Sequence, residues 1–220
     1  MTRFYFVRHG KTQWNLEGRY QGAHGDSPLL ATSFQDIKLL AQRLQGINID
    51  HIYTSPLPRA ALTAQALDYE LGNKIPLTKI ADLKEFDLGI LEGEKFVTVE
   101  QKYPHLIWAF RHDPSQYQAQ LVQGESFAEV IQRTTKFVVD LARQDADNRL
   151  TLLIVSHGGC LTAMIKSLIG VPLHLLRQDG GLSNTSLTTV DTYDQGKTFH
   201  LIQWNDTSFL QRHLNKSDTV

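Results

Sequence analysis

The chain has 220 residues and a mass of 24.9 kDa, which fits one domain with an insertion better than two domains. Hydrophobic residues make up 41% of it and charged residues 20%, so there is enough apolar material for a core and a disordered chain is excluded. The formal net charge of −1 excludes a bulk basic field for nucleic acid, so any anion site must consist of a few local cations.

The single cysteine, Cys160, excludes an internal disulfide and a metal site made of several cysteines. No apolar run approaches the ~20 residues that span a bilayer. The apolar run at residues 4–7 is too short for the core of a signal peptide. We therefore expect a cytoplasmic protein with neither a membrane nor a nucleic acid as partner. We also expect a monomer or homodimer, although none of these observations distinguishes the two.

Strand and helix patterns alternate in the first third of the chain. The continuous apolar run at 4–7 predicts a buried strand, and the polar, glycine-rich stretch at 10–32 predicts a long functional loop. Helical spacing from Ile37 to Leu44 predicts a helix that Gly46 ends. The elements expected next are a strand at 51–54, a helix at 59–71 and a weak strand at 77–80.

The remainder begins with an irregular region, 82–124, for which we expect short helices and loops. A capping box of Ser126 and Glu129 then announces an amphipathic helix. The elements expected after it are a buried strand at 151–155, a helix at 160–169, and two strands at 185–193 and 198–204 that form a hairpin. The polar tail at 211–220 is expected to be frayed.

This order of elements predicts an α/β fold with three α/β/α layers and a mostly parallel central sheet. We expect a single domain over residues 1–210. A helical insertion at about 85–145 would form a lid on it, and the polar tail would follow.

Two of the predicted strands end in a histidine followed by glycine, as Arg8-His9-Gly10 and as Ser156-His157-Gly158-Gly159. Ligands collect at the carboxyl ends of strands in open α/β sheets, and the free N–H groups of a helix that opens there favour an anion. Arg8 and Arg59 lie at the same kind of edge and match the geometry of a phosphate or a carboxylate. The pattern predicts an anion site, and two unrelated loop histidines are the alternative.

Three acidic residues, Glu85, Asp87 and Glu92, follow within eight positions and predict either a solvated loop or a general acid over the site. For metals, His9 and His157 are suitable ligand types, but catalytic zinc sites usually need three protein ligands. The sequence holds neither a His-x-x-x-His motif nor an Asp-rich cluster. We therefore expect no metal and no cofactor, and loss of activity in chelator would favour the alternative of a metal-dependent hydrolase.

These motifs resemble those of the histidine phosphatase superfamily, also called the phosphoglycerate mutase-like family, in family order from residue 3 to about 160. The matching segments are 8–15, 18–22, 26–29, 54–60, Glu85 to Gly93, 124–126 and 156–159. Departures are Thr32-Ser33-Phe34 at the start of the first long helix, Leu91 in place of a common Trp, and an additional His24 at the pocket mouth.

The resemblance implies a role for each matching residue. His9 would be the nucleophile that forms a phosphohistidine, and Glu85 would protonate the leaving alkoxide. Arg8, Arg59 and His157 would hold the phosphoryl oxygens. The residues implied to bind the rest of the substrate or its phosphate are Asn15, Gln21 and Gly158.

The function implied is that of a metal-independent phosphatase acting on a small phosphorylated metabolite. Two alternatives remain at this point. One is a 2,3-bisphosphoglycerate-dependent phosphoglycerate mutase, which returns the phosphoryl group to its substrate. The other is a non-catalytic phosphate-binding regulatory module, which would have no need of an acid such as Glu85.

Overall fold

The computed structural model describes residues 1–219, and its centre is a six-stranded sheet of order β3-β2-β4-β1-β5-β6. The strands are β1 (Thr2–Arg8), β2 (His51–Thr54), β3 (Leu77–Lys79), β4 (Thr151–Ser156), β5 (Leu187–Thr192) and β6 (His200–Asp206). Strands β1 to β4 pair in parallel, whereas β5 runs antiparallel to both β1 and β6. The sheet is therefore mostly parallel, as predicted.

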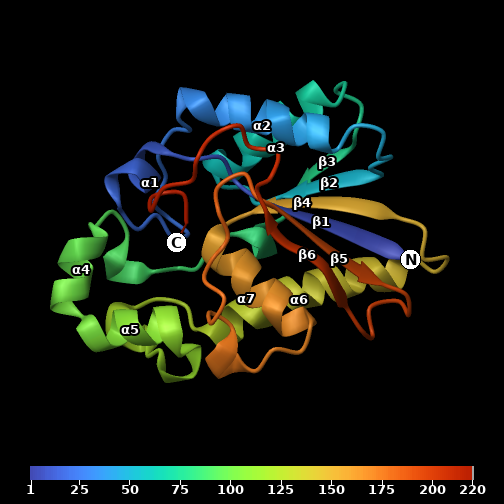
Figure 1. Cartoon of the computed structure of the whole chain (residues 1–220). Coiled ribbons are helices and arrows are strands. Elements are labelled where there is room, and N and C mark those ends of the chain that lie inside the picture. The colour runs from blue at the N-terminus through green and yellow to red at the C-terminus, as the bar shows by residue number, and fades with distance from the viewer. Residues whose placement is uncertain (220) are drawn as a thin grey trace.

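Helices cover both faces of this sheet, because successive side chains of a buried strand point to opposite sides. Phe4 and Phe6 of β1 pack in one apolar cluster with α6 (Phe127–Gln144) and α7 (Gly158–Leu168). Tyr5 and Val7 pack in another with α2 (Ala31–Arg43) and α3 (Pro58–Glu70). Figure 1 shows the two helix pairs on opposite sides of the strands, which confirms the three-layer α/β/α prediction.

Short helices lie beyond the carboxyl ends of the parallel strands (Figure 1). They include α1 (Gln13–Glu17), α4 (Phe96–Lys102) and α5 (Pro104–His112), and 3-10 turns join them to the rest of the chain. These turns are η1 (Ala81–Leu83), η2 (Gly89–Leu91), η3 (Pro114–Gln116), η4 (Ala119–Val122) and η5 (Leu173–Leu175). A third apolar cluster, with Phe86 and Phe110 in it, fixes α4 and α5 against the start of α6. The region 82–124 thus has the short helices expected of it.

Two helix starts show where local sequence signals succeed and fail. The predicted capping box is present at α6, where Ser126 and Glu129 bond to each other's backbone N–H groups. Helix α2, by contrast, begins at Ala31, before the apolar spacing that starts at Ile37, and Leu30 gives it no side-chain cap. Its first turn is held by the Ser33 hydroxyl, which donates to the Lys11 carbonyl at 2.7 Å. This tertiary contact replaces the missing local signal.

The segment 211–219 is folded back against the body of the protein, so the expectation of a frayed tail is wrong. Asp218 is fully buried and pairs with Arg212 at 2.8 Å and with Lys11 at 3.2 Å. Arg212 and Asp218 are thus paired with each other, and they also pair with Asp36 and Lys11, respectively, in the body of the protein. A prediction based on polarity alone cannot anticipate these pairs.

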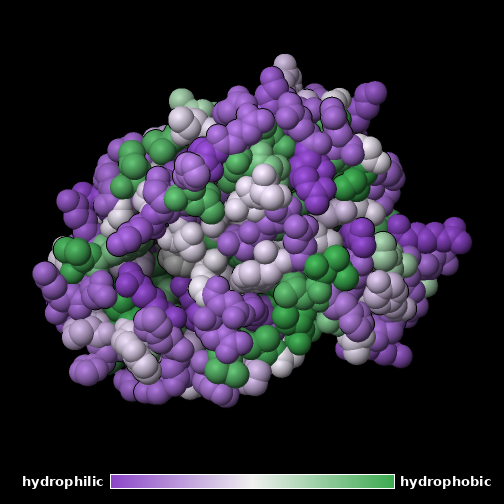
Figure 2. Space-filling model, in the orientation of Figure 1, coloured by the Kyte–Doolittle hydropathy of each residue, from purple (hydrophilic) through white to green (hydrophobic). Residues whose placement is uncertain are grey.

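The face seen in Figure 2 is mostly hydrophilic, with hydrophobic residues gathered over α7 and β6. Within residues 1–219, no helix has both the length and the apolar character needed to cross a membrane.

Candidate active site

His9 follows the last residue of β1 and is 3% exposed. Its ring Nδ1 lies 2.8 Å from the Gly10 carbonyl, which can only accept, so we assign the ring proton to Nδ1 and the lone pair to Nε2. Burial, and then the charges of Arg59 and Arg8, hold the pKa of His9 well below 6.5. The ring is therefore a neutral imidazole with a free nucleophilic nitrogen.

His157 follows β4, and its ring centroid lies 5.2 Å from that of His9. Its Nε2 lies 2.7 Å from the hydroxyl of Ser55, and that hydroxyl already accepts the Leu57 backbone N–H. We assign Ser55 as donor to Nε2, because the described residues offer its hydroxyl proton no other acceptor, and this assignment places the ring proton on Nδ1. Nδ1 is buried and has no partner within residues 1–219. Burial, followed by the charges of Arg59, His9 and Arg8, lowers the pKa of His157 well below 6.5.

Arg8 and Arg59 are both 1% exposed and approach the histidines from different elements. The Nη1 of Arg8 donates to the carbonyls of Leu182 and Asp218. Burial lowers the pKa of Arg8 to about 10, against the opposing charges of Glu85 and Asp218.

Arg59 is in the first turn of α3 and donates to the Gly22 and Gly25 carbonyls and to the Asp26 carboxylate. The Nε of Arg59, like that of Arg8, is buried without a partner among the described residues. Arg8 is thus anchored through Nη1 and Arg59 through both of its Nη groups, and each keeps a buried Nε–H without a partner among the described residues.

Glu85 places its carboxylate at the start of α7. The carboxylate accepts the backbone N–H groups of Cys160 at 2.7 Å, Gly159 at 3.0 Å and Phe86 at 3.0 Å. This approach requires glycine at position 159, because a Cβ there would lie 2.9 Å from Glu85 Oε1. Arg133 of α6 holds the same segment by donating to the carbonyls of Lys84 and Glu85.

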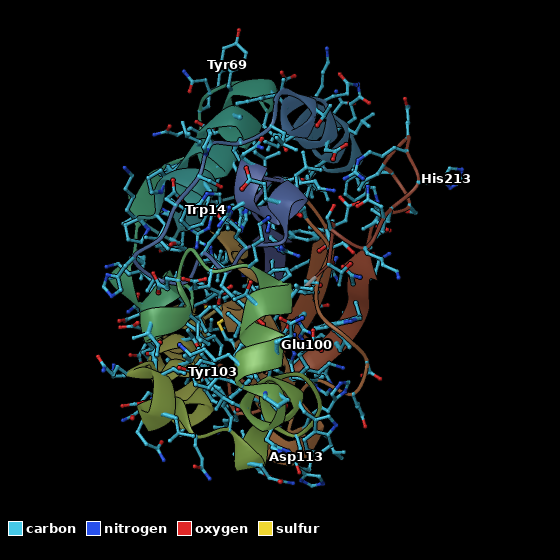
Figure 3. The ribbon with its side chains drawn as sticks, turned by 90° about the vertical axis from the view of Figure 1, so that its left-hand side faces the viewer. Trp14, Tyr69, Glu100, Tyr103, Asp113 and His213 are labelled. Carbon is cyan, nitrogen blue, oxygen red and sulfur yellow. The ribbon has the colours of Figure 1, made fainter. Side chains whose placement is uncertain are left out.

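These side chains surround a cavity of about 40 Å³ whose wall includes Arg8, His9, Asn15, Gln21, Arg59 and Glu85. A wider groove of about 480 Å³ adjoins it and shares Glu85 as a wall residue. Figure 3 looks onto the edge of the sheet where the parallel strands end. In this view Trp14 of α1 lies in the upper half of the molecule and Tyr103, at the end of α4, lies in the lower half. His157 and Gly158 are not in the cavity wall and lie buried behind it, next to His9 and Arg8 respectively.

The sequence-predicted residues thus converge, although Asn15 and Gln21 are already hydrogen-bonded. Asn15 Oδ1 accepts from Thr12, and Gln21 bonds to Thr12 and Ser27. His24 is at the mouth of the groove, where its Nε2 lies 3.2 Å from Asp87.

Sequence reasoning named Glu92 only as an alternative acid, but the structure gives it a different place. Both of its oxygens accept backbone N–H groups, those of Ala23, His24 and Gly25 on one loop and that of Leu88 on another. The first of these loops, residues 22–25, also supplies the carbonyls of Gly22 and Gly25 to which Arg59 donates.

Other residues that touch the site residues escaped the sequence analysis. Ser55 was quoted only as part of a motif, and nothing in the sequence pointed to Arg133 or to Asn184, whose amide donates to the His9 carbonyl at 3.1 Å. The capping box is the only signal near Arg133, and none exists for Asn184. Among residues 1–219, no three His, Cys, Asp or Glu side chains come together as a group that could hold a metal ion.

Comparison with known proteins places this arrangement in a family. Residues 4–207 match the family model of the histidine phosphatase superfamily (branch 1). A probable phosphoglycerate mutase GpmB from Cronobacter sakazakii is 34% identical over 191 residues, covering 87% of this chain and 85% of that protein. The chain therefore belongs to the histidine phosphatase superfamily and is an enzyme of phosphoryl transfer.

Solved structures agree with this assignment. Bacillus stearothermophilus YhfR has a TM-score of 0.85 at 33% identity, covering 95% of this chain and 99% of that chain. A mycobacterial glucosyl-3-phosphoglycerate phosphatase in complex with VO3 has a TM-score of 0.81 at 26% identity, covering 93% of this chain and 99% of that chain.

Proposed function

We propose that the chain is a metal-independent phosphomonoesterase that hydrolyses a small phosphorylated metabolite through a phosphohistidine at His9. The observation that carries this proposal is that Arg8, Arg59 and His157 lie near His9 and that each has a buried side-chain nitrogen without a partner within residues 1–219. A buried donor without an acceptor costs about 1–3 kcal/mol. Three of them around one nucleophile fit a ligand with several anionic oxygens, as a phosphoryl group has.

The first step forms a bond between His9 Nε2 and phosphorus and breaks the bond from phosphorus to the ester oxygen. A neutral imidazole suits this step because it is not repelled by the anionic ester. Arg8, Arg59 and His157 stabilise the charge on the equatorial oxygens, where phosphoryl transfer gains most. Glu85 gives a proton to the leaving oxygen, and its place between cavity and groove supports this role.

In the second step water attacks phosphorus, Glu85 takes its proton, and the bond from phosphorus to Nε2 breaks to release phosphate. His9 is then free for the next cycle. Phosphoglycerate mutation is the second candidate, since the curated relative is named a probable phosphoglycerate mutase. It differs only in what accepts the phosphoryl group.

The segment 85–124 favours water as the acceptor. Its cations are Lys95, Lys102 and Arg111, whereas its acids include Asp87, Glu92, Glu94, Glu100 and Asp113. One of the cations, Arg111, lies 3.5 Å from Glu100. A segment over the site with more acids than cations would bind the second phosphate of a bisphosphorylated intermediate poorly. Such segments decide whether the phosphoryl group passes to water or returns to the substrate.

The test is to incubate the enzyme with 3-phosphoglycerate and a trace of 2,3-bisphosphoglycerate, then to assay both 2-phosphoglycerate and free phosphate. A panel of phosphorylated metabolites run in parallel, each scored by kcat/KM, names the substrate. Release of phosphate without a need for the bisphosphate supports the phosphatase. Formation of 2-phosphoglycerate faster than release of phosphate would overturn it in favour of the mutase.

A further inference from the structure

The C-terminal segment, residues 211–219, contacts the active site from behind. Figure 1 shows this end of the chain beside α1, and Figure 3 shows His213 pointing away from the body of the protein. Its inner residue, Asp218, has no exposed surface. The segment lies outside every sequence motif on which the proposed function rests.

The Asp218 carboxylate ties three parts of the chain together. It accepts from Arg212 at 2.8 Å, from the Asn215 backbone N–H at 2.8 Å, and lies 3.2 Å from Lys11 Nζ. Arg212 also bonds to Asp36 on α2 at 2.8 Å. Burial alone would raise the pKa of Asp218, but these hydrogen bonds outweigh it and lower that pKa. The side chain is therefore a charged anchor that fixes the turn from 215 to 218.

The backbone carbonyl of the same residue bonds to the active site. It accepts Nη1 of Arg8 at 2.9 Å and the backbone N–H of Asn184 at 2.8 Å. The Leu182 carbonyl accepts the same Nη1. Two carbonyls on one nitrogen fix the plane of the guanidinium. The Arg8 Nε would lie 3.1 Å from a Cβ at position 158, so Gly158 leaves room for the guanidinium.

We propose that Asp218 is a positioning residue that holds the Arg8 guanidinium in the orientation that receives the phosphoryl group. The inference rests on the proposed function, because it assumes that Arg8 binds phosphoryl oxygens. An arginine fork acts through its geometry, and displacement of a reacting group by about 1 Å can cost about 100-fold in rate. Asp218 touches no substrate and acts only through the carbonyl that it anchors.

The experiment is a double-mutant cycle between Asp218→Asn and Arg8→Lys. Lysine has no guanidinium plane for the Asp218 carbonyl to fix. We measure the dissociation constant of orthovanadate by direct titration and kcat/KM for p-nitrophenyl phosphate. Asp218→Asn in the wild-type background should weaken orthovanadate binding and lower kcat/KM by about 10- to 100-fold. In the Arg8→Lys background the same substitution should change either value by no more than about twofold.

Two further variants keep the result interpretable. Lys216→Ala changes an exposed neighbour in the same segment and should leave both values unchanged. Arg212→Gln removes one anchor of Asp218 from a partly exposed position. It should give a smaller loss that also disappears in the Arg8→Lys background, and it decides the matter if Asp218→Asn does not fold.

The outcomes separate this inference from the proposed function. Equal losses in both backgrounds would reduce Asp218 to a structural role and overturn the inference. So would an Asp218→Asn variant that folds and binds orthovanadate within about twofold of wild type. Failure of the wild type to bind orthovanadate would instead overturn the proposed function, and the inference with it.

Discussion

The rings of His9 and His157 lie 5.2 Å apart because their strands are parallel neighbours, with Arg8 of β1 paired to Ser156 of β4. Both rings are buried beside two arginines, and both pKa values lie well below 6.5. Below pH 6.5 the unfolded chain therefore binds protons that the folded chain does not. The free energy of unfolding should fall as the pH drops through 6.5 and should level off only below the folded pKa values.

Replacing one of these two histidines should make the free energy of unfolding less dependent on pH. We expect the decrease in the urea unfolding free energy between about pH 7.5 and about pH 5.5 to be smaller in His157→Gln than in wild type. His213→Gln, which changes an exposed histidine, is the matched control and should keep the full decrease. An undiminished decrease in His157→Gln would show that His157 is not held neutral.

Glu85→Gln tests the proton donor. An alkoxide needs a proton to leave and a phenolate does not, so kcat/KM for alkyl phosphates should fall by about 10²- to 10⁴-fold, while that for aryl phosphates falls far less. Glu70→Gln, at the exposed end of α3, should change neither. Equal losses on both substrate classes would assign the acid to another residue, with Asp87 as the next candidate.

Arg59→Ala should lower kcat/KM by about 10²- to 10³-fold, because it removes a donor aimed at the charge of the transition state. Orthovanadate should raise the Tm of the wild type by mass action and should lose most of this effect in the variant. Arg143→Ala removes a largely exposed arginine and serves as control. An Arg59→Ala variant with wild-type affinity for orthovanadate would place Arg59 outside the site.

Glu92→Gln should disturb Arg59 from a distance. The new amide nitrogen cannot accept a backbone N–H, so the loop 22–25 loses part of its anchor and Arg59 loses the alignment of its carbonyl partners. We expect kcat/KM to fall by about 10- to 100-fold, with little further loss in an Arg59→Ala background. Glu94→Gln, an exposed neighbour, should have no effect. Additive losses would separate Glu92 from Arg59.

Much of the fold and the centre of the site could be predicted because their signals are local. The buried runs at 4–7 and 151–155, each followed by a histidine and a glycine, are enough to place His9 and His157 at one edge of a parallel sheet. The arrangement around them could not be predicted in this way. Asp218 and Glu92 act through backbone groups that lie far away in the sequence, and such contacts leave no residue pattern. Polarity alone therefore suggested a frayed tail and a solvated acidic loop.

The most direct test of the phosphohistidine mechanism is to look for the phosphorylated histidine during turnover. The enzyme is mixed briefly with p-nitrophenyl phosphate, quenched in alkali and digested, and the modified peptide is identified by mass spectrometry. We expect base-stable, acid-labile phosphate on His9 in the wild type. A His9→Ala variant that keeps its fold should carry no phosphate and show no turnover. Turnover without phosphate on His9, or near-normal turnover in His9→Ala, would exclude His9 as the nucleophile.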